Sequence, residues 1–126
     1  MNKGHIYFEI HADEPKRAIN FYSRVFGWKF SEVPGLPIAY WTIETGGSRG
    51  GLLKRPAPAP SPQSGSNAFV CSLEVEDFDS TAKTITDSGG IIALAKFAVP
   101  NTCWQGYFVD PEGNTFGIFQ EDATAK

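Results

Sequence analysis

The chain has 126 residues, of which 41% are hydrophobic and 20% are charged, and its formal net charge at pH 7 is -3. This length and composition are those of one globular domain with its own core, and the acidic balance argues against nucleic acid or an anionic membrane as a partner. The first residues lack the apolar run of a signal peptide, and no stretch is long enough to cross a bilayer. We therefore expect a cytoplasmic protein.

The first half of the chain predicts a strand, a helix and three more strands. The strand covers residues 6–11, and the segment HADEPKRAINFYSRVFGW then carries apolar residues at helical spacing. Asp13 or Glu14 begins this helix, and Gly27 ends it as a left-handed cap. The face that we expect to be buried consists of Ala18, Phe21, Tyr22, Val25 and Phe26. Strands follow at residues 28–33, 38–45 and 51–55.

The second half repeats this order after a proline-rich segment. Alternating prolines in RPAPAPSPQSGSN, residues 55–67, exclude a helix and predict an extended connector. A strand then precedes a helix that Asp77 caps and Gly89-Gly90 ends. Further strands follow, the last two joined by the turn DPEGN. The predicted elements lie at residues 68–75, 76–90, 91–97, 103–110 and 114–120.

The two halves can be aligned as an internal repeat. Tyr7 aligns with Val70 and, after a small difference in loop length, Gly51 aligns with Gly117. The repeat predicts an α+β fold of two βαβββ modules, at about residues 4–54 and 68–121, within a single domain spanning residues 1–126. In each module one helix covers one face of a small mixed sheet. We expect the other faces of the two mixed sheets to enclose a cavity.

The first strand, HIYFEIH, has one apolar row and one polar row, because successive side chains of a strand point to opposite faces. The polar row consists of His5, Tyr7, Glu9 and His11. We expect each histidine, at an end of the strand, to be solvated. Glu9 lies in the middle, and a buried carboxylate needs hydrogen-bond donors, so it either lines a ligand pocket or anchors a structural hydrogen bond. Tyr7 would present its hydroxyl to the ligand or to Glu9.

Tryptophan and cysteine residues leave further alternatives open. Trp41 and Trp104 lie on inner strands, where they either form a wall of the pocket or pack in the core, whereas Trp28 is expected in the core. Cys71 shares a strand face with apolar residues, which predicts a buried thiol. The chain has two cysteines, so neither a disulfide framework nor a clustered zinc site is expected.

The helix segment HADEPKRAINFYSRVFGW and the terminal DPEGNTFGIFQ resemble motifs of the glyoxalase / bleomycin resistance / extradiol dioxygenase group, the vicinal oxygen chelate superfamily. The resemblance spans nearly the whole chain and is greatest to its short members related to lactoylglutathione lyase. In metal-dependent members, four ligands come from equivalent strands of the paired modules. Carried onto this sequence, those positions are Tyr7, about Gly51, Val70 and Gly117.

These four positions do not suit a divalent metal. Glycine and valine have no ligand atom in the side chain, and a phenol such as that of Tyr7 is a poor ligand. A shift of the first strand by two residues would place His5 or Glu9 at the first position and leave the others unchanged. No cofactor is therefore expected, although zinc, nickel, iron or manganese bound in another way is the alternative.

Three functions remain possible at this point. The first is metal-free binding of a small organic ligand in the cavity, as the resemblance to bleomycin resistance proteins implies, with contacts from Tyr7, Glu9, His11, Trp41, Val70 and Trp104. The second is a lyase or isomerase in which Glu9 is the general base and Tyr7 or His11 the acid. The third is a structural or regulatory subunit with a filled cavity. In each case the resemblance implies a homodimer.

Overall fold

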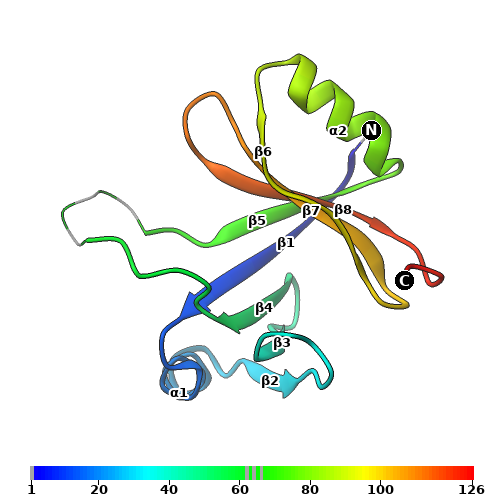
Figure 1. Cartoon of the computed structure of the whole chain (residues 1–126). Helices are drawn as coiled ribbons and strands as arrows, with labels where there is room; N and C mark the ends of the chain where they lie inside the picture. The colour runs from blue at the N-terminus through cyan, green and yellow to red at the C-terminus, as the bar shows by residue number, and fades with distance from the viewer. Residues whose placement is uncertain (1, 62, 64, 66) are drawn as a thin grey trace. The chain divides into compact units, whose positions relative to one another are not determined.

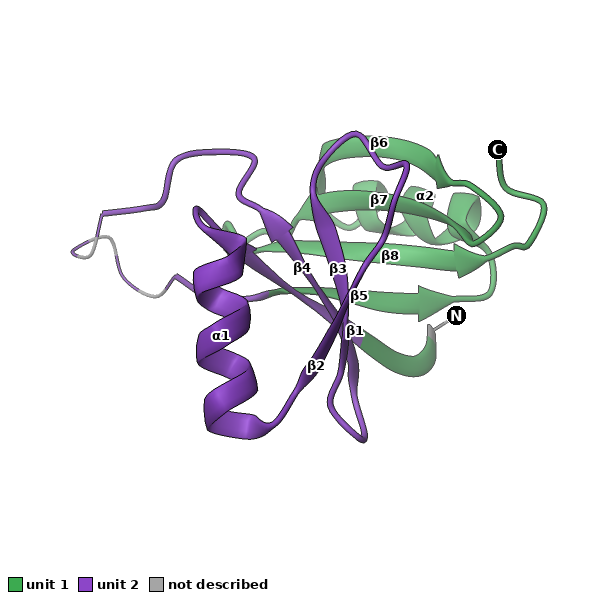
Figure 2. Cartoon of the chain, turned by 90° about the horizontal axis from the view of Figure 1, so that it is seen from below, with its two compact units in different colours: residues 1–6, 70–126 green, residues 7–69 purple. Residues whose placement is uncertain are grey.

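The computed structural model describes residues 2–61, 63, 65 and 67–126, and Figure 1 shows the chain as a ribbon. The chain forms two compact units, which Figure 2 colours separately. Unit 2 consists of residues 7–69, and unit 1 of residues 1–6 and 70–126. The predicted module boundaries stay a prediction. The predicted connector, residues 55–67, includes residues 62, 64 and 66, which lie outside the described residues.

Unit 2 contains a mixed sheet in the strand order β2-β3-β4-β1. Strands β1 and β4 run parallel, and the other neighbours run antiparallel. Strand β1 begins in unit 1 and enters unit 2 at Tyr7. The elements are β1 (Asn2–Ala12), α1 (Pro15–Phe26), β2 (Lys29–Glu32), β3 (Tyr40–Glu44) and β4 (Arg49–Lys54).

Unit 1 contains a second mixed sheet, in the strand order β5-β8-β7-β6. Strands β5 and β8 run parallel, whereas β7 runs antiparallel to both of its neighbours. The elements are β5 (Val70–Val75), α2 (Phe78–Asp87), β6 (Ile91–Val99), β7 (Cys103–Val109) and β8 (Thr115–Glu121). Each unit thus has the order βαβββ, and the predicted α+β class is confirmed.

The helix ends follow the predicted local chemistry. Pro15 opens α1 after Glu14, and Gly27 ends it with φ 70° while its N–H donates to the Ser23 carbonyl at 3.0 Å. In α2 the Asp77 side chain accepts a hydrogen bond from the Ser80 N–H at 3.2 Å. The left-handed cap and the Asp77 N-cap are therefore confirmed.

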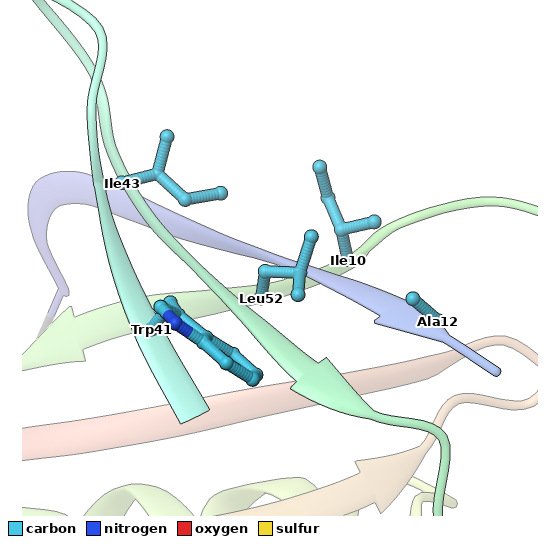
Figure 3. Close-up of a cluster of buried hydrophobic side chains, with 5 residues drawn as sticks. All are labelled: Ile10, Ala12, Trp41, Ile43 and Leu52. Atoms are coloured by element: carbon cyan, nitrogen blue, oxygen red, sulfur yellow. The ribbon is translucent and has the colours of Figure 1, made fainter. Parts of the chain in front are cut away.

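The core of unit 2 lies between α1 and one face of its sheet. Its buried members come from three neighbouring strands and appear together in Figure 3: Ile10, Ala12, Trp41, Ile43 and Leu52. Ala18, Ile19 and Tyr22 of α1 pack against them. Each large apolar side chain removed from water contributes about 1.5–3 kcal/mol to folding. The core of unit 1 is built in the same way, from Val75, Phe78, Phe108 and Ile118.

Two sequence predictions about burial are wrong. Phe21, Val25 and Phe26 of α1 are 56%, 54% and 59% exposed, because the apolar stripe of this helix is wider than the part that contacts the sheet. Cys71 is also exposed. It lies near the start of β5, whereas the core beneath α2 contains Val75 at the other end of that strand. Among the described residues, no helix is long and apolar enough to cross a bilayer.

Candidate functional site

The polar row of β1 includes a buried carboxylate, that of Glu9, in unit 2. Glu9 is 8% exposed, and its Oε2 accepts a hydrogen bond from the Tyr40 hydroxyl at 2.8 Å. The hydroxyl of Tyr7 lies 2.8 Å from that of Tyr40. Tyr7, Tyr40 and Glu9 therefore form a chain of hydrogen bonds, which we call the tyrosine–glutamate chain.

A glycine makes room for this chain. Gly51 of β4 lies between Glu9 of β1 and Thr42 of β3 in the strand register. Tyr40 is two residues before Thr42 and therefore on the same face, and its ring extends across β4. A Cβ atom on Gly51 would overlap the Tyr40 hydroxyl and lie 2.8 Å from Cε1 of the ring. The missing side chain of Gly51 is thus the space that Tyr40 uses to reach Glu9.

Burial and the neighbouring groups keep the Tyr40 hydroxyl protonated by raising its pKa. Burial is the main cause that raises the pKa of this phenol, and the neighbouring Glu9 and Tyr7 raise it further. Tyr40 is therefore neutral and carries its proton throughout the physiological pH range. It acts as a hydrogen-bond donor to the carboxylate, not as a phenolate.

His11 lies farther along β1, beside a shallow groove of about 390 Å³ at the end of that strand. Arg55 Nη2 donates to the His11 carbonyl at 3.1 Å, and Arg55 Nε lies 3.3 Å from Asp13 Oδ1. The pKa of His11 is lowered, mainly by burial and also by the Arg55 charge, while Glu9 opposes the shift. His11 is half-buried, so the prediction of a solvated side chain holds only in part for this residue.

Unit 1 repeats the glycine arrangement with uncharged groups. Ser72 is 1% exposed, and its Oγ accepts a hydrogen bond from Gln105 Nε2 at 3.1 Å. Gly117 lies between Ser72 of β5 and Tyr107 of β7 in register. A Cβ atom on Gly117 would overlap the Ser72 hydroxyl and lie 2.7 Å from Gln105 Nε2. Gln105 thus crosses β8 over a glycine as Tyr40 crosses β4.

Unit 1 also contains a buried carboxylate, that of Glu74, which contacts His5 and Lys3. His5 Nδ1 lies 2.7 Å from Glu74 Oε1, and Lys3 Nζ lies 3.6 Å from Glu74 Oε2. The hydrogen bond from His5 is the main cause that lowers the pKa of Glu74. The His5 side chain is 77% exposed, as predicted, although β1 begins at Asn2 and His5 therefore lies within the strand and not at its end.

Three further predicted contact residues, Trp41, Val70 and Trp104, are not members of the tyrosine–glutamate chain and are described in their own units. Trp41 lies in the core of unit 2, on the sheet face that α1 covers. Trp104 packs against the core of unit 1 and donates from Nε1 to Asp122 Oδ2 at 3.1 Å. Val70 is half-buried at the start of β5. For the tryptophans, core packing is the alternative that the structure shows.

Sequence reasoning missed Tyr40, Ser72 and Gln105. It treated the tryptophans beside two of them as candidate pocket walls, and those neighbours point to the opposite faces of their strands. The repeat carried a signal for two of them. Tyr40 lies two residues before the residue that pairs with Gly51, and Gln105 lies two residues before the residue that pairs with Gly117. A long polar side chain diagonal to a glycine can cross the intervening strand.

The residues at the inherited metal positions do not fit a divalent metal. Gly51 and Gly117 offer no side-chain ligand, and the space beside them is filled by Tyr40 and by Ser72 with Gln105. Glu9, not Tyr7, lies opposite Gly51, and its carboxylate is hydrogen-bonded to a phenol. Within the described part of the chain, no three His, Cys, Asp or Glu side chains gather as a metal ion would require.

Comparisons with known proteins agree with this fold. A protein of Didymella fabae described as "Glyoxylase-like domain-containing protein" is 29% identical over 87% of this chain and 88% of its own. Streptomyces coelicolor methylmalonyl-CoA epimerase has a TM-score of 0.69 at 15% identity, covering 100% of this chain and 99% of its own. A Vibrio splendidus member of the glyoxalase/bleomycin resistance protein/dioxygenase superfamily has a TM-score of 0.65 at 17% identity, covering 94% of this chain and 98% of its own.

The family assignment rests on the sequence itself. The model of the Glyoxalase/Bleomycin resistance protein/Dioxygenase superfamily matches residues 4–118, which is most of the chain. The match runs from β1 into β8 and includes the two glycines over which polar side chains cross. The chain belongs to the Glyoxalase/Bleomycin resistance protein/Dioxygenase superfamily.

Proposed function

We propose that this chain binds a small organic ligand without a divalent metal, in the way that bleomycin resistance proteins of the superfamily suggest. One observation carries the proposal. At both glycines where the superfamily resemblance would require metal ligands, polar side chains of the same unit fill the space: Tyr40 at Gly51, and Ser72 with Gln105 at Gly117. A hydrogen-bonding anchor has taken the place of a ligand atom.

The ligand anchor in this proposal is the tyrosine–glutamate chain of unit 2. It lies on the sheet face that α1 leaves uncovered, and Tyr7 and Tyr40 are only half-buried. A few placed polar groups among apolar ones are typical of a site for a small molecule. The anchor can orient such a ligand without supplying a metal.

Metal content tests this proposal directly. We expect the purified protein to hold far less than one equivalent of zinc, nickel, iron or manganese by elemental analysis, and EDTA to leave its thermal midpoint unchanged. A stoichiometric metal whose removal by EDTA lowers that midpoint would overturn the proposal. In that case the metal ligands would have to lie outside the four inherited positions.

A lyase or isomerase is the second candidate, and the buried carboxylate of Glu9 favours it. Glu9 would remove a proton next to a carbonyl, and Tyr7 or His11 would return one. Methylmalonyl-CoA, named in the structural neighbours, is a suitable test compound. Exchange of its α-proton in D₂O, lost in Glu9→Gln, would support the enzyme; no exchange above the buffer rate is the result that ligand binding alone predicts.

We also propose that the protein is a cytoplasmic homodimer. The exposed apolar side chains of α1, Phe21, Val25 and Phe26, support a second copy as the partner, because such side chains are usually covered in an assembly. Size-exclusion chromatography with light scattering should give twice the mass of the 126-residue chain. A monomeric mass at all concentrations tested would contradict the dimer.

A further inference from the structure

We infer that the tyrosine–glutamate chain selects ligands that donate hydrogen bonds, above all protonated amines, and discriminates against oxyanions. This inference rests on the proposed function, because it names the ligand chemistry of the same anchor. It follows from the direction of the hydrogen bonds among Tyr7, Tyr40 and Glu9.

The direction of the chain is fixed at its centre. Tyr40 has one hydroxyl proton, and it donates that proton to Glu9 Oε2 at 2.8 Å. The contact of 2.8 Å between the two phenols must then use the proton of Tyr7, because Tyr40 has none left to give. Tyr7 therefore donates to Tyr40, and Tyr40 donates to Glu9.

This direction determines what a ligand must bring. A carboxylate can only accept hydrogen bonds, and both phenols have already committed their protons within the chain. Whatever other contacts these groups make, any further polar partner has to supply a proton of its own. An ammonium group supplies up to three and is also attracted by the Glu9 charge, whereas a carboxylate or phosphate supplies none.

The same direction weakens Tyr7 as a general acid. An acid must donate its proton to the reacting atom, and the Tyr7 proton is already given to Tyr40. A developing oxyanion would also find no donor in this chain. The anchor therefore suits recognition of a donor better than stabilisation of an enolate.

Among the described residues of unit 2, two cations lie on this sheet face, Arg49 and Lys29, and both pair with Glu44 in the strand register. Arg49 lies opposite Tyr7 and next to Glu44 in the strand register, and it is exposed. An exposed arginine beside a glutamate of the neighbouring strand contributes little net charge to the face. Its substitution by glutamine is a suitable control, because it removes a possible oxyanion contact and leaves the tyrosine–glutamate chain intact.

Three fragments of the same size test the inference: benzylamine, benzyl alcohol and benzoate. Each is titrated into the ¹⁵N-labelled full chain at pH 7, and shifts of the backbone amides at residues 7–9, 40–42 and 50–52 are followed. We expect benzylamine to bind most tightly, benzyl alcohol more weakly, and benzoate to leave these amides unshifted. Glu9→Gln should weaken benzylamine about 10- to 100-fold, as expected for a charge-assisted hydrogen bond. Arg49→Gln should not weaken it.

Tyr7→Phe is a second variant, which keeps the inference testable if Glu9→Gln does not fold. It leaves the bond from Tyr40 to Glu9 in place, and we expect it to weaken benzylamine only a few-fold. The inference is overturned if benzoate binds at these amides as tightly as benzylamine, if no fragment shifts them at millimolar concentration, or if Glu9→Gln binds benzylamine as the parent does. Benzoate bound to a metal-free protein would defeat this inference alone, whereas a stoichiometric metal would defeat the proposed function.

Discussion

Units 1 and 2 use one backbone arrangement for two different chemistries. In each, a polar side chain of the third strand crosses over a glycine of the fourth strand to reach a polar residue of the first. In unit 2 these groups are the phenol of Tyr40 and the carboxylate of Glu9. In unit 1 they are the amide of Gln105 and the hydroxyl of Ser72. The geometry of the repeat is common to both, and only unit 2 carries a charge at this place.

The difference shows which part of the repeat controls chemistry. Glycine at positions 51 and 117 leaves the space that the crossing side chain occupies, and the residue on the first strand sets the charge. A buried carboxylate needs a donor more than a buried hydroxyl does, because leaving a charged group unsatisfied costs more. Unit 2 should therefore respond more strongly than unit 1 when this contact is broken.

The largest effect is expected for Gly51→Ala. Its Cβ would overlap the Tyr40 hydroxyl, so the ring must move and the bond to Glu9 breaks. Inserting an atom into a packed site and losing a charge-assisted hydrogen bond should together lower the free energy of unfolding by about 3 kcal/mol. Urea unfolding of parent and variant measures the change.

Gly47→Ala is the matched control, because a Cβ at Gly47 has no heavy atom within 4 Å. It should change the stability by less than about 0.5 kcal/mol. Gly117→Ala should lie between the two, since the Ser72 hydroxyl and the flexible end of Gln105 can move aside more easily than the ring of Tyr40. Equal effects of the alanine substitutions at Gly51 and Gly47 would mean that Tyr40 does not occupy the space over Gly51.

Removing only the hydroxyl of Tyr40 in unit 2 or of Ser72 in unit 1 should lower the free energy of unfolding by less than Gly51→Ala does. Tyr40→Phe keeps the ring and takes away a donor to the buried Glu9, so we expect a loss of about 2 kcal/mol. Ser72→Ala takes away a neutral acceptor from Gln105, for which about 1 kcal/mol is expected. Thermal and urea unfolding of both variants compare them; a larger loss for Ser72→Ala would reverse the comparison.

The sequence predicted the order of elements and the repeat because these depend on local patterns. The left-handed cap at Gly27 and the N-cap at Asp77 need only the residues around them. Burial of Phe21 and of Cys71 was predicted wrongly, because a periodic pattern shows that a face is apolar and not how far a neighbouring element covers it. Glu9 was found from its place in β1, whereas its partner Tyr40 depends on a register between strands far apart in sequence.

The helix N-termini offer a further comparison between the units. Asp77 accepts a hydrogen bond from Ser80 N–H at the start of α2, whereas Glu14 at the start of α1 makes no side-chain cap bond. Asp77→Ala should therefore cost about 1 kcal/mol, and Glu14→Ala should cost clearly less. Chemical denaturation of the two variants under the same conditions tests this. Equal losses would show that Glu14 contributes as much to α1 as a capping side chain does.

The smallest effect concerns Glu74, the buried carboxylate of unit 1 that contacts His5 and Lys3. The pKa of Glu74 is held below its ordinary value of 4.5, chiefly by the hydrogen bond from His5, with further help from Glu121 and from the Lys3 charge. A lowered pKa in the folded state stabilises the protein above the ordinary value, and this stability is lost as pH falls through the lowered pKa. His5→Ala should reduce stability near pH 6 by less than about 1 kcal/mol, because the imidazole is exposed.

The pH dependence separates this interaction from a simple loss of packing. Urea midpoints of the parent and of His5→Ala should differ near pH 6 and converge in acid, since protonated Glu74 no longer gains from His5. Curves that stay parallel from pH 6 into acid would mean that His5 acts through contacts other than Glu74. Convergence would instead show that His5 acts on the charged form of Glu74 in unit 1, the counterpart of the contact that the neutral phenol of Tyr40 makes with Glu9 in unit 2.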